Sequence, residues 1–323
     1  MQIDGLVSTI IPVWNRPTLL REAFTSVLAQ TYRPIEIIIV DDGSTDSTPA
    51  VITQLKAMHP NLVRIATTVN SGPGGAREVG RKLAYGEFIQ YLDSDDLLSP
   101  NKFEMQVAGL REFPDCGISY GPTFYQEIDG GNPERPWKRT GEVIKTLFPS
   151  MLVERWWGTS TPLYRRSLTD KGGAWTTLRS EEDWEYDCRL ALHGVRLHYC
   201  SARVSTERCH TGFRLSNDGS TDARKLADRA KARELVLNYA KRAGISCEEF
   251  EMQHFARQLF LLSRQCGAAG LYEESRRLFY LARDASPPLK GVGLDFRLYE
   301  IAARAVGWTV LGKIACQLDT FRR

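Results

Sequence analysis

Strand-like and helix-like segments alternate four times near the start of the chain. Apolar runs rich in β-branched residues lie at 6–12, 35–40, 62–69 and 87–92. Segments with helical spacing of apolar residues follow them, at about 17–30, 47–58, 70–85 and 100–113. The run at 35–40 is almost wholly apolar, as is typical of strands buried on both faces. The alternation predicts an α/β fold with a mostly parallel, Rossmann-like sheet flanked by helices.

A polar cluster follows each of the four strands: Asn15, Asp41–Asp42, Asn70–Arg77 and Asp93–Asp96. Ligands of parallel sheets bind at the carboxyl ends of the strands, so these clusters are expected to converge on one crevice. In a strand-like conformation Asp93 and Asp95 would face the same side and could bind one hard cation beside phosphate oxygens. For an isolated acidic segment, a solvated loop that caps the next helix is the alternative.

Gly72-Pro73-Gly74-Gly75 stands between a strand and a helix, as a dinucleotide-binding fingerprint would. That fingerprint requires a third glycine where this chain has Arg77, and no ribose-binding acid follows the next strand. A dehydrogenase-type dinucleotide site is therefore disfavoured. Free amides at a helix N-terminus beside an arginine still suit a diphosphate.

From about Asp222 strand signals stop and helical periodicity continues to the end of the chain. We expect an α/β domain at 1–221 and a C-terminal α-helical domain at 222–323. The last helical segment places Trp308, Val310 and Ile314 near Lys313, a pattern that suits a membrane surface or packing on its own domain.

The amino-acid composition of the chain argues against some classes of binding partner and cofactor. A net charge of +3, without basic runs interleaved with aromatics, argues against nucleic acid. The seven cysteines form no C-x-x-C pair or regular framework, which disfavours zinc and disulfides and favours reduced cytoplasmic thiols. No apolar stretch approaches the roughly 18 residues of a membrane span, and no signal peptide is recognisable. We expect a cytoplasmic protein, with peripheral contact at the inner face of the membrane as a further location.

Six motifs occur in a fixed order over about residues 5–215, and together they are more specific than any one of them. They are Val7–Arg16, Val40–Asp46, Asn70–Arg77, Gly86–Ile89, Leu92–Asp96 and Glu182–Trp184. In this order and spacing the chain resembles family-two inverting glycosyltransferases with the GT-A fold. The C-terminal hundred residues have no counterpart in the minimal domain of that family.

The resemblance implies a nucleotide-diphosphate sugar donor, foremost a UDP-sugar, and Mn²⁺ or Mg²⁺ as cofactor. It implies an acceptor hydroxyl on a carbohydrate, a lipid-linked molecule or a protein, in polysaccharide, glycan or glycolipid synthesis. By motif position, the residues expected to bind the nucleotide sugar are Thr9, Ile11, Pro12, Asp41, Asp42, Asn70, Arg77, Asp93 and Ser94. Those expected to bind the metal are Asp95, Asp96 and His210, although a surface or core histidine is the alternative at 210.

The proposed reaction needs a general base separate from the metal ligands, because the acceptor hydroxyl loses a proton as it attacks. Asp183 is the first candidate for this catalytic role and Glu182 the second. The alternative is an acidic first helical turn favoured by the helix dipole, with Ser180 as its cap. Trp156, Trp157 and Trp184 are candidates for stacking on sugars or for the core.

Two other functions compete with glycosyl transfer. A sugar nucleotidyltransferase would need a glycine-rich loop with a basic residue after the first strand, where this chain has Val13–Pro17. A non-catalytic nucleotide-sugar-binding scaffold would act through the helical tail, which is also the candidate for oligomerisation.

Overall fold

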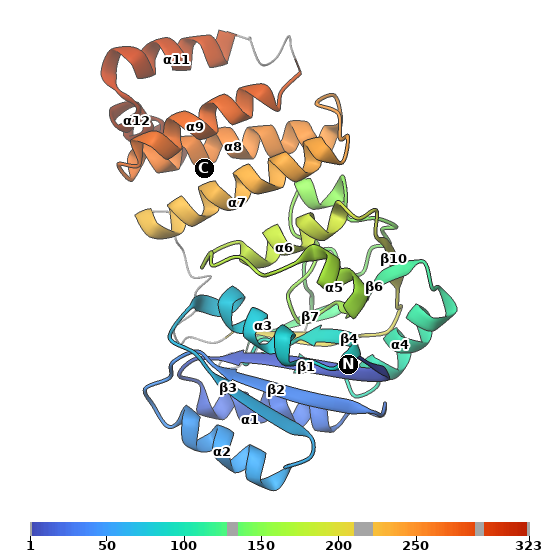
Figure 1. Cartoon of the computed structure of the whole chain (residues 1–323). Coiled ribbons are helices and arrows are strands. Elements are labelled where there is room, and N and C mark those ends of the chain that lie inside the picture. The colour runs from blue at the N-terminus through green and yellow to red at the C-terminus, as the bar shows by residue number, and fades with distance from the viewer. Residues whose placement is uncertain (1, 128–134, 210–221, 288–293, 322–323) are drawn as a thin grey trace. The chain divides into compact units, whose positions relative to one another are not determined.

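The structure is a computed structural model that describes residues 2–127, 135–209, 222–287 and 294–321 (Figure 1). Its contacts divide the chain into two compact units. The first comprises residues 1–147, 155–177 and 193–212, and the second comprises 148–154, 178–192 and 213–323. The second unit therefore includes two short segments from the α/β part of the sequence as well as the C-terminal helices. A domain boundary between residues 221 and 222 stays a prediction.

The first unit is built on a seven-stranded sheet, which confirms the predicted α/β fold. Its strands in sheet order are β10 (Arg196–Tyr199), β6 (Cys116–Tyr120), β9 (Leu163–Arg165), β4 (Gly86–Tyr91), β1 (Ile3–Val13), β2 (Ile35–Asp41) and β3 (Val63–Thr67). Strands β4, β1, β2 and β3 are mutually parallel, and β9 is antiparallel to both of its neighbours. The analysis of the sequence did not predict β9, because three residues are too few to show a periodic pattern.

Helices cover both faces of this sheet, as Figure 1 shows for β1 to β3. They are α1 (Pro17–Leu28), α2 (Thr48–Met58), α3 (Gly72–Leu83), α4 (Lys102–Glu112) and α5 (Arg166–Gly172). Apolar side chains of α1, α2 and α4 form one core cluster with alternate residues of β1, β2 and β4. On the other face α3 approaches β1 closely at Gly80, where an added Cβ would lie 2.3 Å from Cγ2 of Ile10.

A second, four-stranded sheet completes the first unit. Its strands in order are β5 (Leu97–Leu98), β11 (Ser205–Cys209), β7 (Thr123–Glu127) and β8 (Arg135–Pro136). Strands β7 and β8 pair antiparallel, and residues 128–134 between them lie outside the described part of the chain. Strand β5 directly follows the acid segment at 93–96 and pairs with β11, so it ties that segment to the second sheet.

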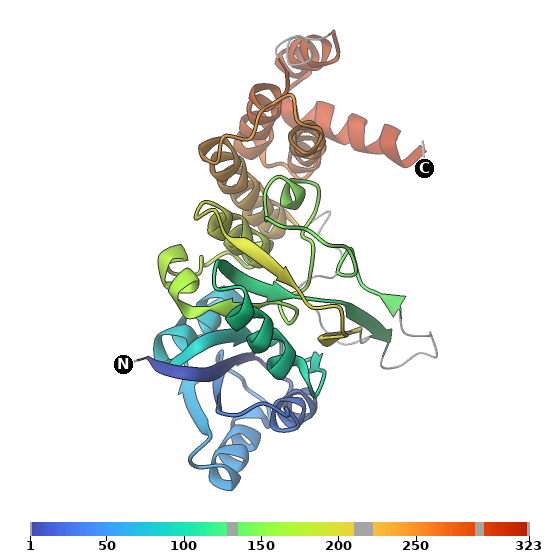
Figure 2. The ribbon, with the colours of Figure 1, turned by 90° about the vertical axis from the view of Figure 1, so that its right-hand side faces the viewer.

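The second unit is helical. Its elements are η1 (Ser150–Leu152), α6 (Glu182–Ala191), α7 (Ala223–Arg242), α8 (Phe250–Ala268), α9 (Tyr272–Asp284), α11 (Leu294–Val306) and α12 (Trp308–Phe321). Helices α7, α8 and α9 pack together, and α12 packs on α8 (Figures 1 and 2). Aromatic rings from α8, α9, α11 and α12 form a common core around Phe279.

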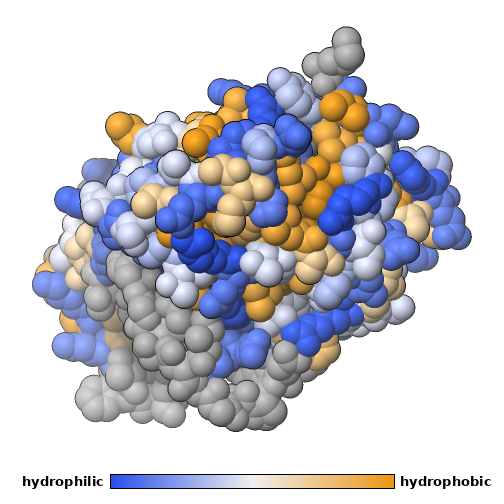
Figure 3. Space-filling model, turned by 90° about the horizontal axis from the view of Figure 1, so that it is seen from below, coloured by the Kyte–Doolittle hydropathy of each residue, from blue (hydrophilic) through white to orange (hydrophobic). Residues whose placement is uncertain are grey.

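The surface mixes hydrophobic and hydrophilic residues, and the face shown in Figure 3 has hydrophobic patches between hydrophilic ones. In the second unit α12 exposes Val310, Ile314 and Leu318, each by 44–54%. A search of the described residues for a helix long and apolar enough to cross a membrane finds none.

Helices α8 and α12 meet through two glycines. A Cβ on Gly312 would lie 2.6 Å from the backbone nitrogen of Ala268, and one on Gly267 would lie 2.6 Å from the carbonyl oxygen of Trp308. Such distances fall below normal van der Waals contact, so a side chain at either position must push the helices apart.

We predict that Gly312→Ala lowers the free energy of unfolding by about 1–3 kcal/mol, as overpacking a close contact does. Urea titration of the full chain measures this change. Gly141→Ala is the matched control, because a Cβ there meets no atom within 4 Å, and it should leave stability unchanged. Equal stability of the Gly312 variant and the parent would show that the helices do not depend on this contact.

Candidate functional site

The four polar clusters predicted to converge do meet at one edge of the main sheet. Strand β1 hydrogen bonds to β2 on one side and β4 on the other, and β2 to β3. Beyond the strand ends Asp42 N donates to Val13 O at 2.9 Å and Thr68 N to Asp41 O at 2.9 Å. These bonds bring the loops that follow β1, β2, β3 and β4 together at their carboxyl ends.

Asn15 connects two of these loops. Its backbone is left-handed (φ 51°), a conformation that asparagine adopts more readily than most residues. Asn15 Oδ1 accepts a hydrogen bond from Thr45 N at 2.8 Å, and Asn15 N donates to Ser44 Oγ at 2.9 Å. Asn15 therefore fixes the loop after β1 to the loop after β2, and Arg16 takes the cap position of α1.

Both predicted aspartates after β2 are buried and bonded to backbone amides. Asp41 Oδ1 accepts from Ser44 N at 2.9 Å, which closes a turn. Asp42 accepts from Ser71 N at 2.8 Å and Gly72 N at 2.9 Å, so it satisfies free amides at the start of α3. Asp42 therefore holds the third loop in place, and the amides it occupies are the ones predicted for a diphosphate.

The acid segment forms a turn, not the strand-like continuation expected from its sequence. Asp96 N donates to Asp93 O at 3.0 Å, and β4 ends before the segment, at Tyr91. The same-face argument for Asp93 and Asp95 therefore fails. Each of the two carboxylates instead forms an ion pair with an arginine from another loop: Asp93 with Arg77 (2.7 Å) and Asp95 with Arg16 (2.6 Å).

Arg77 is a buried cation whose position is set by two contacts. Its side chain is 4% exposed, and its guanidinium carbon lies 4.9 Å from the centre of the Trp175 ring. The ring and the Asp93 carboxylate together orient the guanidinium at the sheet edge. Arg77 was among the predicted nucleotide-binding residues, and Trp175 was not predicted.

Asp96 differs from the other acids of the segment because it is turned into the protein. Ser160 Oγ donates to its Oδ2 at 2.7 Å, and Arg208 N donates to its Oδ1 at 3.2 Å. Burial, followed by the negative charges of neighbouring carboxylates, raises the pKa of Asp96 well above its usual value. Both oxygens of Asp96 accept hydrogen bonds from the protein, and its predicted role as a metal ligand stays a prediction.

Arg208 supports the acid segment from β11. Its Nε donates to the carbonyl oxygen of Asp95 at 2.5 Å, and its Nη1 pairs with Glu22 of α1. Sequence reasoning missed Arg208 and Ser160, because both meet the acids only through the folding of distant segments. Arg16, by contrast, stands in the first motif and could have been proposed as a counter-charge.

Five other predicted nucleotide-binding residues differ in accessibility. The side chains of Thr9 and Ile11 are fully buried within the sheet, and Ile11 belongs to the core cluster. Contact of this motif with a nucleotide stays a prediction, and it would have to be made by the backbone at these two positions. Ser94 is 3% exposed, whereas Asn70 is exposed at the edge, on the loop before α3. Pro12 is buried next to the end of β1, and its role stays a prediction.

Among the described residues, the acid segment supplies the candidate ligands for a hard cation at this edge. Within the described part of the chain no cluster of three or more His, Cys, Asp or Glu residues could hold a metal ion. Predicted ligand His210 lies outside that part. Asp93 and Asp95 fit a cation that takes its other ligands from substrate and water, because Mg²⁺ is commonly held by one or two carboxylates plus phosphates.

The predicted general base lies in the second unit, in the first turn of α6. Asp183 is half-buried, and its Oδ1 accepts from Trp184 N at 2.7 Å. Glu182 is 6% exposed, so Asp183 is the more accessible of the two acids. The predicted Ser180 cap is wrong, since α6 starts after Glu181. All three candidate tryptophans, Trp156, Trp157 and Trp184, are buried, which favours their core interpretation.

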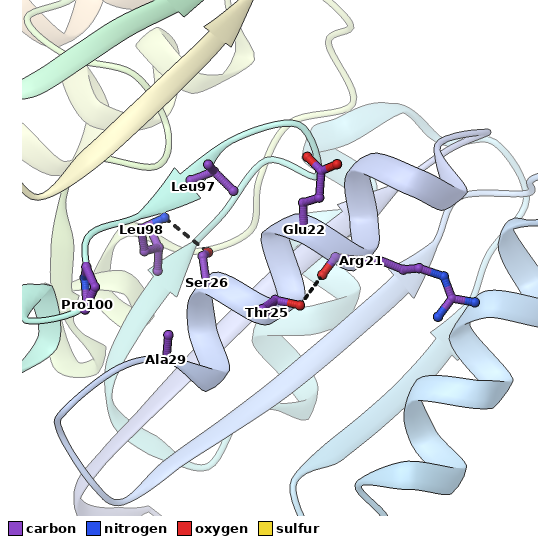
Figure 4. A pocket seen from close by; sticks show the side chains of 8 residues that line it. All are labelled: Arg21, Glu22, Thr25, Ser26, Ala29, Leu97, Leu98 and Pro100. Carbon is purple, nitrogen blue, oxygen red and sulfur yellow. Dashed lines mark hydrogen bonds between the residues drawn. The ribbon is translucent and has the colours of Figure 1, made fainter. Parts of the chain in front are cut away.

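A pocket of about 440 Å³ lies beside the acid segment, between α1 and β5 (Figure 4). Residues of α1 from Arg21 to Ala29 line one side, and Leu97, Leu98 and Pro100 line the other. It includes Glu22, the partner of Arg208, but none of the residues predicted to bind the nucleotide or metal. We therefore do not assign the donor to this pocket.

Comparison with known proteins gives the same family as the motifs. The model of Glycosyl transferase family 2 matches residues 8–170. An uncharacterized glycosyltransferase of Nostoc sp. is 45% identical over 311 residues, covering 86% of this chain and 93% of that protein. The minor teichoic acid biosynthesis protein GgaA of Bacillus subtilis is 35% identical over 133 residues, 39% of this chain and 30% of that protein.

Solved structures share the fold at lower identity. Residues 1–349 of S. aureus TarS in complex with UDP-GlcNAc match 98% of this chain and 92% of that chain, with TM-score 0.68 and 20% identity. A mannosyltransferase of Pyrobaculum calidifontis, solved with GDP-Man and Mn²⁺, matches 98% of this chain and 86% of that chain, with TM-score 0.54 and 20% identity.

Proposed function

The chain belongs to glycosyl transferase family 2, and we propose that it transfers a sugar from a nucleotide-diphosphate sugar to an acceptor hydroxyl with inversion. The observation that carries the proposal is the pairing at the sheet edge of two carboxylates, Asp93 and Asp95, with two arginines, Arg77 and Arg16. This set offers cationic donors to a diphosphate and hard oxygen ligands to a divalent cation.

A UDP-sugar is the foremost donor in this proposal, and Mn²⁺ or Mg²⁺ is the cofactor. The TarS structure that shares this fold was solved with UDP-GlcNAc, and the mannosyltransferase with GDP-Man and Mn²⁺. Asp95 is the first metal ligand and Asp93 the second. When bound, the cation would stabilise negative charge on the leaving diphosphate as a Lewis acid.

The chain's own residues would supply the remaining functions. Arg77 and Arg16 bind and orient phosphate oxygens with charge-assisted hydrogen bonds. Asp183 accepts the proton of the acceptor hydroxyl as its oxygen attacks the anomeric carbon. The new carbon–oxygen bond forms as the bond to the diphosphate breaks on the opposite side, so the configuration inverts and the nucleoside diphosphate leaves with the bonding electron pair.

The two competing functions are less well supported. A nucleotidyltransferase needs a glycine-rich loop after β1, but here that loop is built around Asn15 and its bonds to Ser44 and Thr45. A non-catalytic scaffold would bind the donor without consuming it. UDP release from UDP-GlcNAc with water as acceptor, measured with and without Mn²⁺, separates a scaffold from an enzyme.

The biological setting is proposed from similarity. The match to GgaA favours synthesis of a polysaccharide or related cell-surface glycan, with a carbohydrate, lipid-linked or protein acceptor. Cytoplasmic location and contact of the C-terminal helices with a membrane or a second copy stay predictions. The exposed Val310, Ile314 and Leu318 side chains of α12 are the surface that such contact would use.

The two acids at the end of the segment should behave differently. We predict that Asp95→Asn weakens Mn²⁺-dependent UDP binding by at least about 10-fold, because it removes a charged metal ligand. UDP binding without metal should not fall, because the substitution leaves Arg16 available to phosphate. Calorimetric titration with UDP, with and without Mn²⁺, measures both quantities.

Asp96→Asn is the matched control for this experiment. It preserves the shape of a buried group whose two oxygens already accept hydrogen bonds from Ser160 and Arg208, so Mn²⁺-dependent UDP affinity should change little. Equal affinity of the Asp95 variant and the parent in Mn²⁺ would remove Asp95 from the proposed metal site.

Asp183→Asn should separate binding from chemistry. We predict that UDP affinity is retained while turnover of UDP-GlcNAc falls by the ~10²–10⁴ typical of a lost general base. Glu182→Gln should cost much less. Turnover per folded molecule and melting temperature are measured on the same preparations, and a stable Asp183 variant with near-normal turnover contradicts the assignment.

A further inference from the structure

Helix α6, which carries the proposed base, begins at a residue with an uncommon backbone conformation. Glu181 caps the helix with φ 60° and ψ 17°, in the left-handed region, and its side chain makes no capping hydrogen bond. Residues other than glycine, asparagine and aspartate rarely adopt this conformation unless surrounding contacts impose it. The start of α6 is therefore held by contacts from elsewhere in the second unit.

Two arginines of α7 supply those contacts. Arg233 Nε donates to Glu181 Oε2 and Arg233 Nη2 to Glu181 Oε1, each at 3.1 Å, which is a two-bond fork. Arg229 Nε donates to Glu181 Oε1, also at 3.1 Å. The side chain of Arg233 is 9% exposed and that of Glu181 18%, so solvent screens this pairing less than it screens a surface ion pair.

The same guanidinium also contacts the residue after Asp183. The guanidinium carbon of Arg233 lies 4.6 Å from the centre of the Trp184 ring, and that ring is 5.9 Å from Phe255 of α8. Trp184 Nε1 donates to Met151 O at 2.8 Å. Along the chain, Asp183 therefore lies between Glu181, whose carboxylate binds Arg233, and Trp184, whose ring contacts Arg233.

Helix α7 contacts the chain on both sides of Glu181, the residue at which α6 begins, at two further points. Before it, Arg179 N donates to Asp228 at 2.9 Å. One turn after it, the hydroxyl of Tyr239 donates to Glu185 Oε1 at 2.8 Å, and Glu185 is fully buried. Contacts from α7 therefore bracket Asp183 on both sides along the chain.

We propose that α7 positions the general base, with Arg233, Arg229 and Tyr239 acting as positioning residues for Asp183. The inference rests on the proposed function and extends it, because it makes the C-terminal helical unit part of the catalytic apparatus. A group that must meet an acceptor hydroxyl tolerates little displacement, and a misplacement of about 1 Å can cost about 10²-fold in rate. Loss of the Glu181 contacts frees the first turn of α6 to rotate or unwind.

The experiment compares Glu181→Ala, Glu181→Gln and Arg233→Lys with the parent, all as full chains. Glu181→Ala removes every hydrogen bond that the Glu181 side chain accepts from α7. Glu181→Gln keeps the length of the side chain and one acceptor oxygen, and Arg233→Lys keeps the positive charge but not the two-bond geometry of the guanidinium. We expect kcat for UDP release from UDP-GlcNAc to fall by about 10- to 100-fold in the alanine variant and less in the other two. KM for the donor and UDP affinity should stay at parental values.

The control is Lys231→Ala on the same helix. Lys231 forms an ion pair with Glu234 at 3.3 Å on the surface of α7, and its side chain is 53% exposed. This variant should keep parental kcat. Hydrogen exchange of the amides of residues 182–186 provides a readout that does not depend on activity, and it should be faster in Glu181→Ala than in Lys231→Ala.

Two results contradict the inference. One is a Glu181→Ala protein whose kcat per folded molecule and α6 exchange match the parent. The other is a variant whose only change is a lower melting temperature, since that shows a role in stability alone. If the parent protein does not release UDP, that result contradicts the proposed function and not this inference. The hydrogen-exchange comparison then decides whether α7 holds the start of α6 in place.

Discussion

The structure depends first on the parallel pairing of β1 with both of its neighbours. In-register bonds to β2 and β4 place the ends of these strands side by side, although the loops that follow them are separated by up to about eighty residues. Only a parallel sheet brings the carboxyl ends of consecutive strands to one edge. Side-chain bonds then lock the loops together, chiefly through Asn15 and Asp42. The candidate donor site is a consequence of this arrangement.

Charge balance is the second constraint. Three aspartates lie within four residues, and each is compensated by a different partner: Asp93 by Arg77, Asp95 by Arg16, and Asp96 by hydrogen bonds from Ser160 and Arg208. In the proposed function, a diphosphate and a cation would replace the partners in these two ion pairs. An arginine beside Asp93 and another beside Asp95 offset the repulsion between these neighbouring carboxylates.

Much of the fold could be predicted from the sequence, because long amphipathic and apolar segments with clear breaks determine β1–α3 and the C-terminal helices. The convergence of the polar loops followed from topology alone. The turn at Asp93–Asp96, the left-handed Asn15 and Glu181, and the supporting roles of Arg208 and Ser160 could not be predicted. Each depends on contacts between segments far apart in the chain, and a single sequence does not display them. Ile11 shows that a motif position does not reveal whether its side chain faces a ligand or the core, since this side chain belongs to the core cluster.

The central claim is that the edge formed by β4, β1, β2 and β3 binds a nucleoside diphosphate with the help of a divalent cation. Calorimetric titration of the full chain with UDP, in Mn²⁺ and again in excess chelator, tests it most directly. The account predicts one UDP per chain in Mn²⁺ and at least about tenfold weaker binding in chelator, because the cation joins the acid segment to the phosphates. Binding of equal strength under both conditions, or no binding of UDP under either, would contradict it.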